Sequence, residues 1–127
     1  MSEQGENRLW AVRGAVQAEA NEAGPILSAS EKLMRELLQR NELAAGDVVS
    51  CLFTVTDDLD AEFPAVAARR IGLDGVPLLC TREIPVPGSL PRVIRLLVHC
   101  YPPEGTEPRH VYLRDATQLR RDLESAQ

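Results

Sequence analysis

The sequence predicts an α/β domain in which two main helices pack on one mixed β-sheet. Short stretches rich in β-branched residues alternate with longer stretches of helical periodicity, in the order strand, helix, strand, helix and three strands. The chain has 127 residues, the length of one ordinary domain. Hydrophobic residues make up 44% of the chain and charged residues 26%, as in an average globular protein. We therefore expect a single domain over residues 1–127, with right-handed crossover connections.

The first half of the chain contains two predicted strands and one predicted helix. Residues 1–7 are polar and are expected to be frayed, whereas residues 9–15 have the short apolar character of a strand. Pro25 can open a helix at its first turn, and apolar residues recur at helical spacing from there to Asn41. Residues 48–56 are rich in β-branched and aromatic residues, which is typical of a buried strand.

A second helix and a third strand are predicted in the middle of the chain. The helix starts near Pro64 and ends at Gly72, a residue that can adopt the left-handed conformation of a helix cap. Residues 76–81 form the predicted strand, in which Pro77 must lie where the sheet needs no backbone donor.

The last third of the chain is predicted to contain a stiff loop, two strands and a polar tail. Three prolines stiffen residues 84–91, and residues 93–101 follow as the most apolar strand. Residues 110–113 can form a last short strand. Residues 115–127 are polar, and we expect them to form a mobile C-terminal tail with one helical turn.

Charge and hydropathy disfavour several classes of function. The formal net charge is −5, whereas nonspecific binding to nucleic acid or to an anionic membrane requires a basic face. No apolar run approaches the roughly 20 residues that span a bilayer. The first dozen residues lack the basic start and apolar core of a secretory signal. We therefore expect a cytoplasmic protein that binds neither nucleic acid nor membrane.

The cysteines and histidines give no sign of a metal site. Cys51, Cys80 and Cys100 fit no zinc motif, and we expect them to be free thiols that act as small core residues. His99 and His110 stand eleven residues apart without a ligand triad. The chain also lacks a GxSxG motif and a glycine-rich phosphate loop. We therefore expect no metal, no cofactor and no nucleophilic catalysis.

Two arginines lie within predicted strands, where apolar residues are usual. Arg95 has apolar neighbours on its own face of the strand. Because an unpaired buried charge is costly, Arg95 must pair with a carboxylate, reach solvent or point into a cavity. Arg13 repeats this pattern between the small residues Ala11 and Ala15. Two arginines that face one cleft would form a site for a dianion, since the arginine fork suits carboxylates. A purely structural role for both arginines stays open.

Glu83 supplies a carboxylate just beyond the third predicted strand. Strict alternation places Cys80 and Glu83 on opposite faces of the sheet. A bend or bulge after Thr81 is therefore required if the two residues act together. Trp10 and Tyr112 are interpreted, on their residue type alone, as core residues.

Five motifs occur in a characteristic order along the chain. They are VRGA at residues 12–15, TxDL and FPAxAAR within residues 56–69, VPLLCTRE at residues 76–83, GSLPRVIR at residues 88–95, and RHVYL at residues 109–113 followed by LR at residues 119–120. In this order and with these gaps the chain resembles the monofunctional chorismate mutases of the trimeric pseudo-α/β-barrel class. The resemblance covers nearly the whole chain.

The resemblance implies a homotrimer whose active sites lie between adjacent subunits, and an isomerase of aromatic amino acid biosynthesis that converts chorismate to prephenate without a cofactor. By position, Arg13 corresponds to the arginine that grips a substrate carboxylate. Arg95 corresponds to the arginine that contacts the ether oxygen and a carboxylate. Tyr112 corresponds to the tyrosine that hydrogen-bonds the enolpyruvyl side, and Cys80 and Glu83 to the pair that holds the ring hydroxyl.

Further residues are implied to line the cleft. The apolar wall would consist of Phe63, Ala65, Leu78 and Leu79, and the cleft mouth and tail would contribute Arg69, Leu119 and Arg120. Val66 stands where some relatives carry a lysine at the site entrance.

Two other functions stay open on the sequence alone. Small trimers of similar architecture include imine- and enamine-hydrolysing enzymes that also place an arginine at a subunit interface. A non-catalytic trimer that binds a small dicarboxylate would likewise use paired arginines. The five ordered motifs favour the mutase over both alternatives.

Overall fold

Five strands form one mixed sheet in the structure, a computed structural model that describes residues 8–119. In chain order the elements are β1 (Trp10–Gln17), α1 (Ala23–Arg40), η2 (Ala45–Asp47), β2 (Val48–Val55), α2 (Ala65–Ala68), η3 (Arg69–Leu73), β3 (Leu78–Arg82), β4 (Val93–Cys100), β5 (Val111–Leu113) and η4 (Arg114–Ala116). The predicted order of the main elements and the predicted α/β fold class are confirmed. The segment predicted to be frayed, 1–7, and residues 120–127 of the predicted mobile tail lie outside the described residues.

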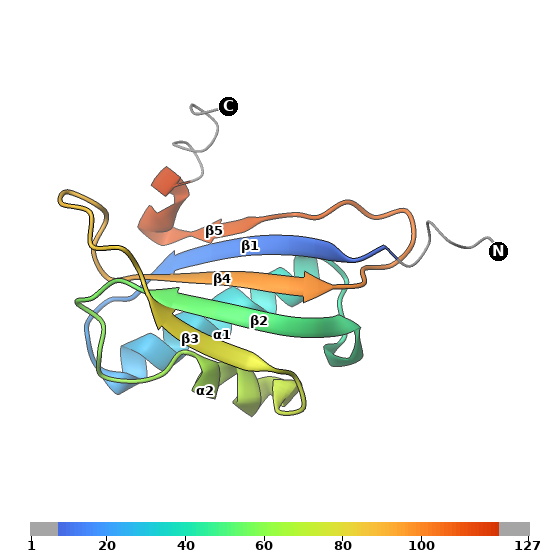
Figure 1. Cartoon of the computed structure of the whole chain (residues 1–127), viewed down its shortest axis with the longest axis horizontal. Helices are drawn as coiled ribbons and strands as arrows, with labels where there is room; N and C mark the ends of the chain where they lie inside the picture. Colours follow the sequence, from blue (N-terminus) through green and yellow to red (C-terminus); the bar gives the residue numbers. More distant parts are fainter. Residues whose placement is uncertain (1–7, 120–127) are drawn as a thin grey trace.

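The strands follow the order β3-β2-β4-β1-β5 across the sheet (Figure 1). The central strand β4 pairs antiparallel with β1 and β2. The outer strands pair in parallel, β5 with β1 and β3 with β2. Within residues 8–119, β3 and β5 are therefore the two edges of the sheet, each with strand pairing on one side alone.

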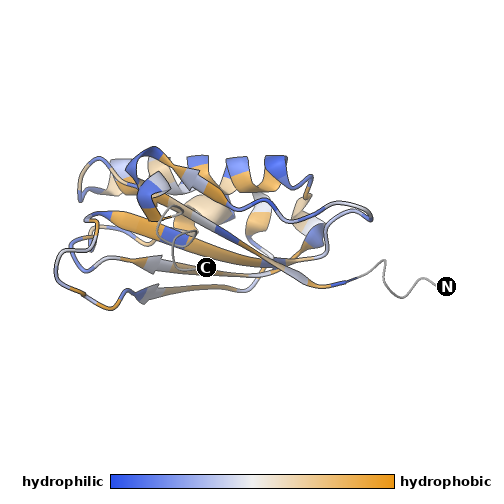
Figure 2. Cartoon of the chain, turned by 90° about the horizontal axis from the view of Figure 1, so that it is seen from above, coloured by the Kyte–Doolittle hydropathy of each residue, from blue (hydrophilic) through white to orange (hydrophobic). Residues whose placement is uncertain are grey.

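The helices α1 and α2 lie on the same face of the sheet and leave most of the other face uncovered (Figures 1 and 2). The side of the helices that points away from the sheet is hydrophilic in Figure 2, as the amphipathic pattern of α1 predicts. The largest fully buried side chains are Phe53, Ile26, Leu33, Met34, Leu37, Leu59, Leu73, Ile94, Val12, Val16, Val93 and Val98. Each contributes about 1.5–3 kcal/mol by leaving water. All of them except Val93, which packs with Ala15 and Ala116 in a separate small cluster, belong to the one main core, so most of this burial lies between helices and sheet.

Gly14 lets α1 approach β1 closely. A Cβ atom at this position would lie 3.0 Å from Cδ1 of Leu33 and 3.3 Å from Cδ1 of Leu37. Both leucines are fully buried. The absence of a side chain at Gly14 therefore sets the spacing of the two layers beside the strand that carries Arg13.

Two prolines explain where elements begin. The helix α1 starts at Ala23, earlier than predicted, and Pro25 is its third residue, a first-turn position whose N–H would have no helical partner anyway. The strand β3 starts at Leu78 and not at the predicted Val76. Pro77 has no N–H to give to the sheet, but its carbonyl accepts from the backbone N–H of Cys51 at 3.0 Å.

The second predicted helix is found at its predicted place but is less regular than expected. One α-helical turn, α2, continues into the π-helical segment η3. Gly72 has a φ of +108°, so the predicted left-handed conformation at this glycine is confirmed. The segment connects β2 to β3, which pairs in parallel with β2.

Candidate active site

The uncovered face of the sheet carries the charged residues that the sequence singles out. The register places Arg95 of β4 beside Ala15 of β1, and Tyr112 of β5 beside Ala15 on the other side. Arg13 pairs with Leu97 two residues along the same two strands. Paired residues point to the same side of a sheet. Arg13, Arg95 and Tyr112 therefore share one face, with the small side chain of Ala15 between the last two.

Arg95 combines the three arrangements that the sequence leaves open for it. Its Nε lies 3.2 Å from Oε2 of Glu83, and 46% of its side chain is exposed. It also lines a cavity, described below. The side chain of Glu83 is 19% exposed, so this ion pair is only partly screened by water.

Glu83 is held by a second contact from the neighbouring strand. The hydroxyl of Thr54 donates a hydrogen bond to Oε2 of Glu83, the same oxygen that faces Arg95. Thr54 pairs with Arg95 across β2 and β4, and with Thr81 across β2 and β3. The three side chains of Thr54, Glu83 and Arg95 thus form one connected group on the uncovered face.

A cavity of about 340 Å³, here called the arginine pocket, lies over this group. Its lining includes Arg13, Ala15, Thr54, Glu83, Arg95 and Tyr112. Two guanidinium groups, one carboxylate and one phenol therefore surround a single space. Such a set of side chains can bind a small molecule with two carboxylates and one hydroxyl group.

His110 fixes the backbone of the strand that carries Arg13. The backbone N–H of Arg13 donates to Nδ1 of His110 at 3.0 Å. This bond joins β1 to the segment before β5. It therefore helps to hold β1, which carries Arg13, next to β5, which carries Tyr112.

A larger hollow of about 540 Å³ adjoins the arginine pocket and shares Glu83 and Arg95 with it. The loop of residues 84–91 forms one wall, and Gln118 and Leu119 form part of the other. Leu119, predicted near the cleft mouth, thus lines the same hollow as Arg95. Arg120, predicted with it, lies outside the described residues.

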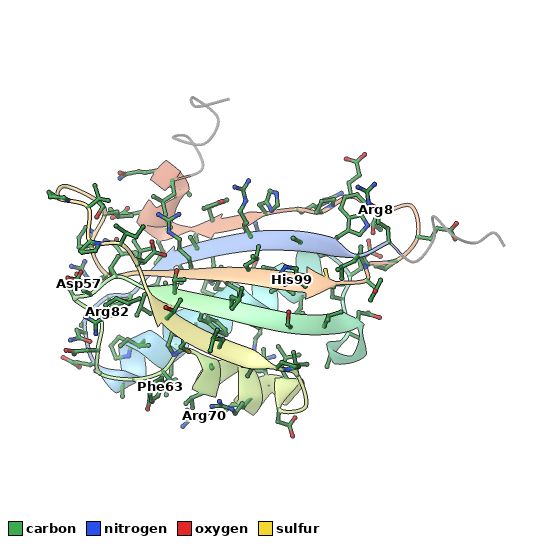
Figure 3. The ribbon with its side chains drawn as sticks, in the orientation of Figure 1. Arg8, Asp57, Phe63, Arg70, Arg82 and His99 are labelled. Atoms are coloured by element: carbon green, nitrogen blue, oxygen red, sulfur yellow. The ribbon has the colours of Figure 1, made fainter. Side chains whose placement is uncertain are left out.

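Cys80 and Phe63 lie in a different cavity of about 340 Å³, here called the Phe63 pocket. Arg82 lines it as well, and Figure 3 shows Phe63 and Arg82 at the same end of the sheet. No bulge interrupts the pairing of β3 with β2 through Arg82. Cys80 and Glu83 consequently point to opposite faces, and the bend that would bring them together within one chain is not present.

The remaining predicted site residues are dispersed. Ala65 is 3% exposed and belongs to the core, and Leu78 packs against the same core. Leu79 is 59% exposed and lies on the uncovered face. Arg69 is exposed at the start of η3. Within a single chain none of these four lines the arginine pocket.

Thr54 and His110 are the site residues that sequence reasoning missed as functional. Thr54 lies in a run of β-formers, and nothing local distinguishes it from any half-buried strand threonine. One signal was available: alternation within β2 puts Thr54 on the face opposite to the buried Phe53. For His110 the sequence offers no comparable signal, because its partner, the backbone N–H of Arg13, lies 97 residues away in the chain.

The cysteines of the core do not ionise readily. Burial raises the pKa of Cys51 from 9.0 to about 12, and nearby Cys100 adds to the shift. Burial likewise raises the pKa of Cys100. All three cysteines are free thiols. Among residues 8–119 no group of three or more His, Cys, Asp or Glu is placed to hold a metal ion, and no helix is long and apolar enough to cross a membrane.

The fold and the site define a small α/β protein that carries an arginine-rich pocket for an anion on the uncovered face of its sheet. Residues 9–123 match the family described as chorismate mutase type I. The chain is 48% identical over 119 residues to the chorismate mutase AroH of Thermus thermophilus, covering 91% of this chain and 97% of the relative. It is 36% identical over 115 residues to the chorismate mutase AroH of Bacillus subtilis, with coverage of 88% and 90%.

A solved structure supports the same assignment. The chorismate mutase from Clostridium thermocellum is similar to this chain with a TM-score of 0.82 and 42% identity, covering 86% of this chain and 98% of that one. The chain belongs to the chorismate mutase type I family. Membership in this family makes it an isomerase, and the resemblance found in the five motifs is confirmed.

Proposed function

We propose that the arginine pocket binds chorismate and catalyses its rearrangement to prephenate. The observation that carries this proposal is that Arg13, Arg95, Glu83 and Tyr112 line one cavity. Chorismate has two carboxylates, a ring hydroxyl and an ether oxygen. Two guanidinium groups suit the carboxylates, and Tyr112 and Glu83 supply hydrogen-bonding groups for the enolpyruvyl side and the hydroxyl.

Arg95 is the proposed electrostatic catalyst. In the 3,3-sigmatropic rearrangement a C–O bond breaks while a C–C bond forms, and negative charge accumulates on the departing oxygen. Glu83 contacts the Nε atom of Arg95, and no hydrogen bond to another described residue occupies the two terminal nitrogens. The terminal fork is therefore open to the substrate, and a positioned cation of this kind stabilises the transition state without reorganisation.

Arg95 alone does not account for the whole acceleration of the reaction. A positioned donor is worth about 3–4 kcal/mol, whereas a millionfold acceleration requires roughly 8 kcal/mol. The remainder would come from Arg13 and Tyr112, which hold the side chain of chorismate over its ring in a reactive pose. Glu83 complements the positive charge that develops on the ring. No proton or hydride passes to the enzyme in this scheme, and no cofactor takes part.

We propose further that a complete site is shared between two chains of a homotrimer. Cys80 and Phe63 lie in the Phe63 pocket, away from Glu83 and Arg95. A partner chain that brings its Phe63 pocket to the arginine pocket would reunite these residues. The uncovered sheet face has apolar side chains for such an assembly, including Leu79 at 59% exposure. A cytoplasmic location, predicted from the sequence, belongs to the same proposal.

Turnover of chorismate tests the activity directly. Purified protein is added to chorismate without metal or cofactor, and loss of the ultraviolet absorbance of chorismate is followed. Prephenate is identified by its acid conversion to phenylpyruvate. Saturable formation of prephenate is the expected result. A folded protein that binds chorismate without turnover would instead favour the non-catalytic dicarboxylate-binding function.

Mixing two inactive variants tests the shared site. Arg95→Ala disables the arginine pocket, and Phe63→Asp places a repelling carboxylate in the Phe63 pocket at a position that is 67% exposed. If each site takes one pocket from each of two chains, random 1:1 mixing restores about one quarter of the sites. If a site lies within one chain, every site of a mixed assembly stays defective. The mass of the particle in solution, with three chains expected, is measured on the same samples.

A further inference from the structure

One polar residue of the arginine pocket has no role in the scheme above. Thr54 lies on β2 between the two neighbouring strands, with Arg95 as its partner on β4 and Thr81 on β3. Its hydroxyl donates to Oε2 of Glu83, and the same oxygen lies 3.2 Å from Nε of Arg95. Thr54 thus holds the carboxylate of Glu83, which in turn orients Arg95.

We infer that Thr54 is a positioning residue for the reaction, acting through Glu83. This inference rests on the proposed function of the arginine pocket. Glu83 follows the last residue of β3, at the edge of the sheet, and its long side chain has several rotatable bonds. Thr54 lies within an inner strand and its β-branched side chain has few rotamers. The hydrogen bond therefore fixes the flexible carboxylate to a rigid part of the sheet.

The position of the carboxylate decides which nitrogens of Arg95 remain open. With Oε2 held by Thr54, Glu83 engages Nε and leaves the terminal fork free. Without the hydroxyl, Glu83 can turn and bind the terminal nitrogens as a bidentate pair, the geometry that arginine and carboxylate favour. The terminal nitrogens of Arg95 would then be bound to Glu83 and could not donate to the ether oxygen in the transition state. Arg13 would still hold a substrate carboxylate.

This difference predicts a separation of kcat from KM. Thr54→Val removes the hydroxyl at almost constant volume, and we expect kcat to fall about 10- to 100-fold because the fork is misplaced. KM is expected to change less than about threefold, since ground-state binding by Arg13 is untouched. Thr54→Ser keeps the hydroxyl and is expected to recover most of the wild-type kcat. Thr54→Ala serves as a second hydroxyl deletion should the valine variant not fold.

Ser50→Ala is the matched control for loss of a strand hydroxyl. Ser50 lies on the same strand and face as Thr54, and its Oγ lies 3.2 Å from Nδ1 of His99. It lines none of the three cavities described above. We expect wild-type kcat and KM in this variant. Thermal unfolding of all variants separates a general loss of stability from a specific loss of rate.

A double-mutant cycle tests whether Thr54 acts through Glu83. If it does, Thr54→Val has almost no further effect on kcat in a Glu83→Ala background, where the acceptor of the Thr54 hydrogen bond is absent. Equal losses in both backgrounds would overturn the inference, as would a Thr54→Val enzyme with kcat within threefold of wild type. Wild-type enzyme and Arg95→Lys are assayed alongside. A wild type that does not convert chorismate would refute the proposed function itself, whereas an impaired Arg95→Lys beside a normal Thr54→Val would refute the role of Thr54 alone.

Discussion

Lysine in place of Arg95 keeps one positive charge in the arginine pocket but removes the planar fork. An ammonium group cannot contact Glu83 through one nitrogen while it presents two others in a plane to the substrate. The substitution therefore separates the contribution of the positive charge to the rate from the contribution of the fork geometry. We expect the fold to persist and the rate of the chemical step to fall.

The structure predicts a small effect of Arg95→Lys on stability and a large effect on kcat. The ion pair of Arg95 with Glu83 is half-exposed on the arginine side, so its loss changes the free energy of unfolding by less than about 1 kcal/mol. Loss of one preorganised donor at the developing oxyanion costs about 2.7–4 kcal/mol, or about 10²- to 10³-fold in kcat. The predicted result is thus a large change in rate with almost none in stability.

The assay is prephenate formation at saturating chorismate, with urea unfolding of the same preparations. Independence of kcat from added viscogen shows that chemistry limits the rate. Arg35→Lys is the matched control, because Arg35 also pairs with a carboxylate, Glu31 at 2.9 Å, but lies on the outer side of α1 with 61% exposure. A kcat for Arg95→Lys within threefold of wild type, under conditions where chemistry limits the rate, would falsify the role of the fork.

The other predictions concern pH and packing. Because no proton is transferred, kcat should vary less than about threefold between pH 5 and 9; a steep bell-shaped profile with chemistry rate-limiting would contradict this. Burial raises the pKa of Cys51 from 9.0 to about 12, so the thiol is protonated in both folded and unfolded chains below pH 9 and ionises first in the unfolded chain above it. The urea midpoint should therefore fall between pH 9 and 12, and a Cys51→Ala variant should show a smaller fall. Gly14→Ala places a Cβ 3.0 Å from Leu33, which should destabilise the fold by about 1–3 kcal/mol. The added Cβ would also lie 3.3 Å from the backbone oxygen of Val111 in β5. Urea unfolding of the variant against wild type measures the loss, and an unchanged midpoint would contradict the clash.

The arginines of the site were predictable because strand alternation is a local property. The sequence around Arg95 shows a charged residue with apolar neighbours, Val93 and Leu97, on its own face of the strand, and the structure places it at a pocket. The same reasoning applies to Arg13. What the sequence does not contain is the register, which pairs Ala15 with Arg95 and with Tyr112. That pairing brings three residues from distant parts of the chain into one cavity.

Thr54 and Cys80 show where sequence reasoning fails. The hydroxyl of Thr54 meets a carboxylate 29 residues away in the sequence, and the meeting depends on the parallel crossover through α2 that sets β3 beside β2. Cys80 satisfies the motif pattern, but the regular pairing of β3 sends it to the helix side. Its partnership with Glu83 would be a property of an assembly, and assembly contacts leave no periodic signal in a single chain.

One face of the sheet packs against the helices and the uncovered face carries the arginine pocket, and this division constrains how the chain can change in length. Deletion or insertion of one residue within β4 would exchange the two faces from that point onward, turning Arg95 toward α1 and an apolar neighbour toward the substrate. Stability and activity would be lost in the same event, and no second substitution nearby could restore both. Loops away from the site, such as residues 102–108, tolerate a change of length far better. Related sequences should therefore vary in length between the strands, whereas each central strand keeps a fixed number of residues.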